Sequence, residues 1–192
     1  MHTSCAILIL AAGSSSRLGE PKQLVRYQEE SLLRQSVSKA LRLSAHVFGL
    51  LGHAYEACLE EINDLNVSVI YHESYAQGIG SSIAVGISHT TAFSQTLIML
   101  CDQPLIPLSH YQTLLSQASS SHIVASQYLP SSRLGVPAVF PKRYYDALCL
   151  LRGDKGAQML LSQEPTHRVA LDAALSVDID TQEDISKHLR FV

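Results

Sequence analysis

Charged residues are few in this chain, and basic residues are not in excess. Only 16% of the 192 residues are charged, and 14 Lys and Arg stand against 17 Asp and Glu, for a formal charge of −3. Broad, salt-dependent binding to nucleic acid requires a basic face, so we expect no nucleic-acid partner and only a local anion site. Hydrophobic residues make up 46% of the sequence, which is typical of a globular protein with a substantial core. We predict a single domain over residues 1–192.

Cysteine pairs and histidine clusters are absent. The four cysteines (Cys5, Cys58, Cys101 and Cys149) lie far apart without a C-x-x-C pair, and three of them fall within apolar runs. This pattern is typical of buried, reduced thiols in a cytosolic protein. The nine histidines show no H-x-x-x-H spacing and form no cluster with cysteine, so we predict no zinc site.

Long hydrophobic runs are absent as well. No apolar run approaches the ~20 residues that a membrane helix requires. The N-terminal residues do not form a basic segment followed by a cleavable apolar core. We therefore expect a cytoplasmic protein without a membrane partner.

Short apolar runs alternate along the chain with segments of helical periodicity. We predict strands at residues 5–9, 46–51, 67–71, 96–101, 122–126, 137–140 and 167–171. We predict helices at residues 32–43, 55–64, 81–91, 108–118, 143–151, 155–162 and 181–189, with Ser31 and Thr181 as N-caps. Strands that alternate with helices of about 10 to 15 residues form βαβ units, so the predicted fold is α/β, with a mainly parallel sheet and helices on both faces.

The stretch 10–22 (LAAGSSSRLGEPK) follows the first predicted strand. Its small residues let the backbone approach a ligand, its serines and amides can donate hydrogen bonds to anionic oxygens, and Arg17 and Lys22 add positive charge. It is not a Walker A loop, because five residues separate its two glycines and Glu20-Pro21 follows them. It also lacks the G-x-G-x-x-G pattern of dinucleotide-binding folds. The residues alone leave two interpretations open, a polyphosphate loop and a serine-rich turn.

Asp102-Gln103-Pro104 follows the most apolar run of the chain. A carboxylate at the carboxyl edge of a central parallel strand lies where open α/β sheets bind ligands. Mg²⁺ usually takes one or two carboxylates together with water and substrate phosphates, which makes Asp102 a candidate ligand. The alternative is that Asp102 caps the next helix or only ends a strand.

Asp178 and Asp180 form a second carboxylate pair near the end of the chain. Their alternating spacing would point both side chains the same way in an extended segment. Asp180 or Thr181 could instead only cap the helix that follows, with Glu183 and Asp184 in its first turn. A metal role requires this segment to fold back beside Asp102.

Two further segments contain glycine, Gly135-Val136-Pro137 and residues 151–158 (LRGDKGAQ). The second segment enters a predicted helix, whose N-terminus could bind an anionic group of an acceptor. Its glycine and aspartate could equally end one helix and cap the next.

Together and in this order, these segments resemble the nucleotidyltransferase family of molybdenum-cofactor biosynthesis, and within it the molybdopterin cytidylyltransferases and their relatives. The resemblance spans nearly the whole chain. Its motifs are L-A-A-G-x-S-x-R-x-G-x-x-K (residues 10–22), a glycine-serine turn (78–82), Asp-Gln-Pro (102–104), G-x-P followed by Phe (Gly135, Pro137 and Phe140), Gly-Asp-x-Gly-Ala (153–157) and Asp-x-Asp-Thr (178–181).

The resemblance implies a three-layer Rossmann-like nucleotidyltransferase fold that binds a nucleoside triphosphate and Mg²⁺. It implies catalytic roles for Arg17, Lys22 and Asp102, and a metal site at Asp102 and Asp180. The implied nucleotide-binding residues are Leu10, Ala11, Ala12, Gly13, Ser14, Ser15, Ser16, Arg17, Lys22, Gly78, Gly80, Ser81, Ser82 and Asp102. The implied acceptor-binding residues are Gln103, Pro104, Gly135, Pro137, Gly153, Asp154 and Gly156.

The implied reaction is attack by a phosphate of molybdopterin on the α-phosphorus of CTP, with loss of pyrophosphate. A phosphate monoester is already largely ionised at neutral pH, so no activated protein nucleophile is required. Catalysis then rests on positioning and on neutralising charge. The implied partners are CTP, molybdopterin or the molybdenum cofactor, and a molybdenum enzyme or its chaperone.

The base and the acceptor are less constrained by the motifs. Ala12 stands where guanylyl-type members carry a second glycine, which favours CTP. Val136 replaces a residue that is often polar, Gln158 replaces a common arginine, and Gln182 a common proline. An arginine lost from an anion pocket removes a bidentate phosphate partner. A guanylyltransferase, a nucleotidyltransferase for another phosphorylated metabolite and a non-catalytic accessory protein that binds the cofactor therefore remain alternatives.

Overall fold

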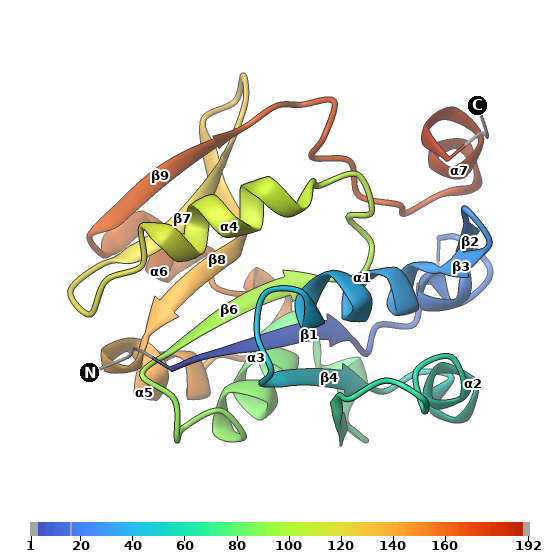
Figure 1. Cartoon of the computed structure of the whole chain (residues 1–192), viewed down its shortest axis with the longest axis horizontal. Coiled ribbons are helices and arrows are strands. Elements are labelled where there is room, and N and C mark those ends of the chain that lie inside the picture. Colours follow the sequence, from blue (N-terminus) through green and yellow to red (C-terminus); the bar gives the residue numbers. More distant parts are fainter. Residues whose placement is uncertain (1–3, 16, 190–192) are drawn as a thin grey trace.

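A computed structural model of the chain describes residues 4–15 and 17–189. Its main element is a seven-stranded sheet with helices on both faces (Figure 1). The strands in order across the sheet are β5 (Ser68–Tyr71), β4 (Val47–Leu51), β1 (Cys5–Ala11), β6 (Gln95–Leu100), β8 (Arg133–Pro141), β7 (Ile123–Tyr128) and β9 (Thr166–Leu171). The helices are α1 (Leu32–Leu41), α2 (Tyr55–Glu60), α3 (Ile79–Ser88), α4 (Leu108–Ser116), α5 (Tyr145–Cys149), α6 (Gln158–Gln163) and α7 (Gln182–His188). None of these helices has the length and apolar character to cross a membrane.

The sheet is mainly parallel, as the sequence predicts, with one exception. β1 pairs in parallel with β4 and β6, and β4 pairs in parallel with β5. β8 runs antiparallel to both β6 and β7. The connection from β7 to β8 is too short for a parallel crossover, which takes about a dozen residues or more. The strand predicted at 137–140 is therefore part of a nine-residue strand that forms a hairpin with β7.

β1 lies in the interior of the sheet, between β4 and β6, and is buried on both faces. Ile7, Ile9 and Ala11 pack in one apolar cluster with residues of α1, α2 and α4. Leu8 and Leu10 pack in another with residues of α3, α5 and α6. This alternation follows from the two-residue period of a strand. The predicted covering of both sheet faces by helices is thus confirmed.

Both predicted N-caps are confirmed. The Oγ of Ser31 accepts a hydrogen bond from the Arg34 N–H at 3.1 Å at the start of α1. At the start of α7, Thr181 and Asp184 form a reciprocal capping box, with the Thr181 N–H donating to Asp184 Oδ2 at 2.8 Å. Such caps satisfy backbone groups that a helix end leaves without partners.

The helices predicted at 143–151 and 155–162 are shorter than expected. Short 3₁₀ turns, Lys142–Tyr144 and Gly153–Lys155, precede α5 and α6. Gly156 has a φ of +53°, a backbone conformation that favours glycine and that no right-handed helix contains. It therefore separates the second turn from α6.

A third apolar cluster joins the loop after β1 to the C-terminal segment. Its buried members are Leu18, Val25, Leu32, Ile179 and Leu189. In Figure 1, α7 lies beside a small hairpin of β2 (Arg26–Tyr27) and β3 (Glu30–Ser31), which the sequence analysis does not predict. Through this cluster, two segments from opposite ends of the chain lie together.

We expect Ile179→Ala to lower the free energy of unfolding by about 2–5 kcal/mol, because Ile179 is fully buried and its truncation leaves a cavity. Ile179→Val removes a single methyl group and should cost about 0.5–1.5 kcal/mol. Urea unfolding followed by circular dichroism measures both values. Equal, small effects of the two variants would show that this cluster does not anchor the C-terminal segment.

Candidate functional site

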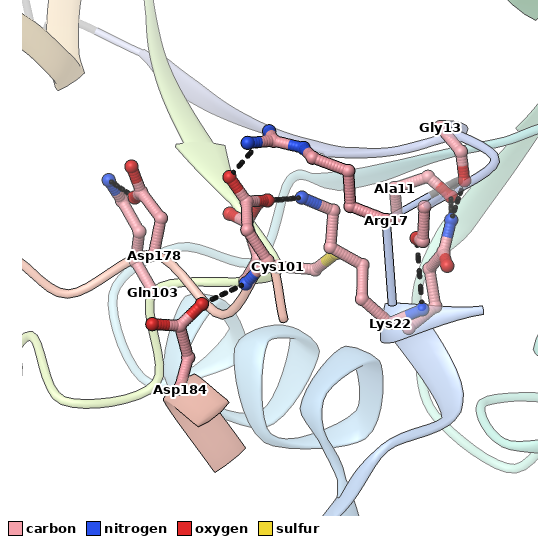
Figure 2. A network of polar contacts seen from close by, with 12 residues as sticks. Ala11, Gly13, Arg17, Lys22, Cys101, Gln103, Asp178 and Asp184 are labelled. Atoms are coloured by element: carbon pink, nitrogen blue, oxygen red, sulfur yellow. Dashed lines mark hydrogen bonds and ion pairs between the residues drawn. The ribbon is translucent and has the colours of Figure 1, made fainter. Parts of the chain in front are cut away.

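The loop after β1 lies at the carboxyl edge of the sheet, between the ends of β4 and β6. Open parallel sheets bind ligands at this edge. The buried amide of Gln23 shapes the loop, because its Nε2 donates to the carbonyls of Ala11 and Gly13 at 2.8 Å each (Figure 2). Ser15 has a φ of +53°, and its Oγ accepts a hydrogen bond from the Lys22 N–H at 3.0 Å. Gln23 thus holds the loop from inside, and Ser15 closes it.

Two backbone N–H groups of the loop have no hydrogen-bond partner in the described part of the chain. The carbonyls of Ala11 and Gly13 are taken by the amide described above, and the carbonyl of Ala12 accepts the His53 N–H at 3.0 Å. The N–H groups of Gly13 and Ser14 make no hydrogen bond to any residue that the structure describes. Successive unpaired N–H groups favour an anion such as a phosphate.

Lys22 lies between two carboxylates. Its ammonium contacts Asp102 Oδ2 and lies 2.8 Å from Asp180 Oδ1, while Arg17 Nη2 lies 3.0 Å from Asp180 Oδ2 (Figure 2). The Lys22 side chain is 19% exposed and that of Asp102 only 10%. Burial lowers the pKa of the Lys22 ammonium, but the two carboxylates outweigh burial and hold this pKa above its ordinary value. Lys22 is therefore charged at neutral pH.

The C-terminal segment folds back beside Asp102, which is the condition that the sequence left open. The N–H of Ile179 donates to the carbonyl oxygen of Asp102 at 2.9 Å. Asp180 then enters the ion pairs, while Thr181 caps α7. Capping and charge pairing are performed by different residues, so the two interpretations of this segment are compatible.

Asp102 and Asp180 suit a divalent cation. Asp102 as a whole residue is 7% exposed, and its Oδ1 is buried without a hydrogen-bond partner among the described residues. Mg²⁺ usually takes one or two carboxylates and completes its shell with water and substrate phosphates. Residues 4–15 and 17–189 contain no group of three or more His, Cys, Asp or Glu that could hold a metal. The pair therefore fits a cation shared with a phosphorylated ligand rather than a site built by the protein alone.

Two adjoining cavities open at this edge of the sheet. The first, of about 300 Å³, is lined by the loop after β1, by Lys22 and Asp102, and by residues at the start of α3. The second, of about 220 Å³, is lined by Gln103 and Asp178, by residues of β8 and by the segment before α6. The successive residues Asp102 and Gln103 thus face neighbouring cavities. The lining residues common to both are Leu10, Ile79, Leu100 and Asp154.

Gly78 and Gly80 allow the start of α3 to pack closely against residues 152–154. A Cβ at Gly80 would lie 2.8 Å from the backbone carbonyl carbon of Arg152. A Cβ at Gly78, whose φ is +92°, would collide with Gly153 and Asp154. These glycines let the start of α3 lie against residues 152–154, which brings Asp154 into the lining of both cavities.

Most residues predicted to bind a nucleotide line the first cavity, namely Leu10, Ala11, Ala12, Gly13, Ser14, Lys22, Gly78, Ser82 and Asp102. Four others do not line it, namely Ser15, Arg17, Gly80 and Ser81. The hydroxyl of Ser81 donates to the Gly78 carbonyl at 2.8 Å and lies 3.0 Å from Nε2 of His72. Ser16 lies outside the described residues.

The residues predicted to bind the acceptor divide in a similar way. Those that line the second cavity are Gln103, Gly135, Asp154 and Gly156. Pro104, Pro137 and Gly153 do not line it. The carbonyls of Pro104 and Pro137 accept hydrogen bonds from Lys39 and Ser126, so these two residues take part in holding the surrounding loops and strands.

Several lining residues lie outside the predicted site. Asp178, weighed above as part of a carboxylate pair, accepts a hydrogen bond from Gln103 Nε2 at 2.8 Å and lines the second cavity. Arg133 and Lys155 bring two cationic side chains to that cavity, and Tyr75 lines the first. Arg133 lies in a hairpin that the sequence did not predict, so no local signal marked it.

Comparison with known proteins agrees with this geometry. A family model described as the MobA-like NTP transferase domain matches residues 7–169. The chain is 28% identical over 193 residues to the nicotine blue oxidoreductase of Paenarthrobacter nicotinovorans, which covers 95% of both chains. It is 27% identical over 166 residues to a probable molybdenum cofactor guanylyltransferase of Bacillus mycoides (84% of this chain and 81% of that one). It is 28% identical over 81 residues to the molybdenum cofactor cytidylyltransferase of Escherichia coli (42% of each chain).

Solved structures share the fold over nearly the full chain. Rv0371c from Mycobacterium tuberculosis superposes with a TM-score of 0.87 at 26% identity, covering 98% of this chain and 99% of that one. A complex of Rv0371c with manganese gives a TM-score of 0.84 at 24% identity, covering 99% and 100%. A nucleotidyl transferase from Methanothermobacter gives 0.84 at 18% identity, covering 97% and 96%, and shows the fold alone. The predicted Rossmann-like nucleotidyltransferase fold is confirmed.

We expect Gln23→Leu to lower the free energy of unfolding by about 1–3 kcal/mol, because it leaves the carbonyls of Ala11 and Gly13 without their donor. Hydrogen exchange measured by mass spectrometry should accelerate in the loop after β1 and stay unchanged in the β7–β8 hairpin. Gln163→Leu, at an exposed position of α6, is the matched control and should change stability by no more than about 0.5 kcal/mol. Unchanged exchange in the loop would show that Gln23 does not hold it.

Proposed function

Because the chain belongs to the MobA-like NTP transferase family and is a nucleotidyltransferase, we propose that it transfers CMP from CTP to the phosphate of molybdopterin or of the molybdenum cofactor, with release of pyrophosphate. We propose further that it does so as one domain in the cytoplasm, with Mg²⁺ as its cofactor. The observation that carries the proposal is the pair of adjoining cavities, with Lys22 and Asp102 at the first and Gln103 at the second. A donor nucleotide in one and an acceptor in the other would meet at their shared wall.

The first cavity supplies the groups that a triphosphate needs. The free N–H groups of Gly13 and Ser14 can donate to phosphate oxygens, and the Lys22 ammonium adds a charge with little exposure to water. Arg17 lies on the more exposed side of the same ion-pair network. In the proposed reaction, Arg17 and Lys22 stabilise the pyrophosphate as negative charge accumulates on it.

The acceptor's phosphate attacks without a protein base, because a phosphate monoester is already largely ionised at neutral pH. The protein's part is to align this oxygen with the α-phosphorus and to exclude other geometries. Asp102 and Asp180 would hold the divalent cation that nucleotidyltransferases of this kind typically use. When bound, the cation neutralises phosphate charge and orients the attacking and leaving oxygens.

Lys22 and a divalent cation compete for the same two carboxylates, Asp102 and Asp180. A second positive charge at this pair repels the ammonium, so Lys22 must turn toward another anion when a cation binds. The triphosphate is that anion in the proposed complex. Nucleotide and cation are therefore expected to strengthen each other's binding.

The second cavity can receive an anionic acceptor. Arg133 and Lys155 line it, so its cations do not depend on the arginine that Gln158 replaces. Gln158 itself donates its Nε2 to the Leu134 carbonyl at 2.9 Å, which gives this glutamine a role in holding the wall of the cavity. The names of the molybdenum-cofactor relatives support molybdopterin or the cofactor as the acceptor.

A guanylyltransferase is the second candidate. The similarity to the probable guanylyltransferase of Bacillus mycoides extends over 84% of this chain, whereas the similarity to the Escherichia coli cytidylyltransferase covers 42%. Both candidates share the reaction and the residues discussed above. Only the base of the donor separates them.

Pyrophosphate release tests the proposed reaction directly. The protein is incubated with Mg²⁺, molybdopterin with or without molybdenum, and each of CTP, GTP, UTP and ATP. We expect turnover with CTP, and we expect Asp102→Asn to lower kcat by about a hundredfold or more, since it removes a buried negative charge from the proposed cation site. Asp64→Asn is the matched control, because Asp64 pairs with Arg34 on the exposed surface and lines neither cavity.

Each other outcome of this assay has a defined meaning. Turnover with GTP in preference to CTP selects the second candidate. Full activity in Asp102→Asn contradicts the assigned cation site. Absence of pyrophosphate release with every nucleotide contradicts the proposed reaction, and binding of the cofactor by that protein in a separate titration selects a non-catalytic accessory protein.

We expect Lys22→Met to bind Mn²⁺ about tenfold more tightly than the unmodified protein when no nucleotide is present, because it removes the competing ammonium. Lys22→Arg keeps a positive charge and should retain the weak binding. Electron paramagnetic resonance of free Mn²⁺ measures each affinity without any turnover. Equal Mn²⁺ affinities in the three proteins would rule out competition for the carboxylates.

A further inference from the structure

Tyr75 lies between the first cavity and a separate, open hollow, which is distinct from the second cavity described above. It begins the 3₁₀ turn Tyr75–Gln77 between β5 and α3 and lines the first cavity. It also lines an open hollow of about 640 Å³ formed by residues 52–57 and Tyr71. In the described part of the chain, Tyr75 alone lines both spaces. Tyr75 therefore lies between the two spaces.

The first cavity has a charged end and an aromatic end. Asp102 follows β6, which pairs with one side of β1, whereas Tyr75 follows β5, which lies beyond β4 on the other side. Lys22 lies with Asp102 at the charged end. A nucleoside triphosphate bound with its phosphates at that end would direct its base toward Tyr75.

Packing fixes Tyr75 in place against Ala12. A Cβ at Gly52 would lie 2.8 Å from the Tyr75 Cβ and 2.9 Å from the Ala12 carbonyl oxygen, so the backbone of Gly52 fills the space between them. The neighbouring His53 donates its N–H to the Ala12 carbonyl at 3.0 Å, and its Nδ1 lies 3.4 Å from the Tyr75 hydroxyl. The rings of His53 and Tyr75 meet edge-on with centroids 5.9 Å apart. The distance between Ala12 and Tyr75 is thus set by a packed unit rather than by one mobile side chain.

We propose that Tyr75 is the specificity-determining residue that restricts this site to a pyrimidine base. This inference rests on the nucleotide-binding role proposed above for the first cavity. A purine carries a second fused ring, which must extend past the space that a pyrimidine occupies, and the Tyr75 side chain closes that direction. The hollow behind Tyr75 is where the additional ring would lie if the wall were removed. The discrimination in this inference comes from the shape of the site at Tyr75, between the first cavity and the hollow behind it.

Nucleotide selectivity in Tyr75 variants tests the inference. Isothermal titration calorimetry with Mg²⁺ measures the Kd for CTP, UTP, GTP and ATP in the unmodified protein and in Tyr75→Ala. We expect the preference for CTP over GTP to fall about tenfold or more in Tyr75→Ala, chiefly through tighter binding of GTP. Tyr75→Leu, of intermediate size, should show a smaller change in the same direction, and it serves in place of the alanine variant if that one does not fold.

Two control variants distinguish the effect of the Tyr75 ring from the effects of its hydroxyl and of changes in the outer hollow. Tyr75→Phe keeps the ring and loses only the hydroxyl near His53, so it should keep the CTP preference within about twofold of the unmodified protein. Tyr55→Ala removes a ring that lines the outer hollow but not the first cavity, and it should leave the preference unchanged.

The outcomes distinguish this inference from the function on which it rests. Intact CTP binding with an unchanged preference in Tyr75→Ala and Tyr75→Leu overturns the role of Tyr75 and leaves the proposed function standing. An unmodified protein that binds GTP as tightly as CTP overturns the restriction to pyrimidines. A protein that binds no nucleoside triphosphate overturns the proposed function together with this inference.

Discussion

The contact of the Lys22 ammonium with Asp102 and Asp180 is the interaction on which the arrangement of the site depends. Lys22 lies 80 residues from Asp102 and 158 residues from Asp180 in the sequence, so these ion pairs join three distant segments. Desolvating such groups costs free energy that charge pairing offsets only in part. The apolar burial of Ile179 supplies the remaining attachment and brings the C-terminal segment to Asp102. The hydrophobic cluster and the ion pairs therefore act as one unit.

The hydrogen-bond partners of the loop after β1 decide which of its backbone groups can bind a ligand. Its carbonyls accept hydrogen bonds from Gln23 and, after the end of β4, from His53, while the N–H groups of Gly13 and Ser14 have no partner among the described residues. A loop with free carbonyls at this place would repel phosphate, whereas a loop with free N–H groups attracts it. The side chains of Lys22, Asp102 and Asp180 then lie near these N–H donors at one edge of the sheet. This mixture suits a ligand that brings both phosphate oxygens and a divalent cation.

Sequence patterns predict those parts of the molecule that depend on local residues. The strand before the loop, the helix caps Ser31 and Thr181 and the strand-terminal Asp102 all follow from short patterns. The contribution of Gln23 could not be predicted, because its role depends on the distance from its amide to two carbonyls in a folded loop. Tyr75 could not be predicted for a related reason, because the two spaces that it lines are formed only in the folded chain. The strand at 137–140 was predicted, but the first residues of β8 and its antiparallel direction were not, because residues 133–136 carry no clear strand pattern.

In the proposed function, the placement of the two cavities separates recognition of the ligands from the chemistry. Tyr75 lies on the β5 side of β1, Gln103 and Asp178 lie beyond β6, and the ion pairs of Lys22 lie between them. In the proposed function, a change at Tyr75 or in the lining of the second cavity would therefore alter the choice of base or acceptor without moving the carboxylates. Asp154 is the exception, because it lines both cavities and packs against the glycine turn before α3. In the proposed function, with one ligand in each cavity, a change at Asp154 should affect both ligands at once.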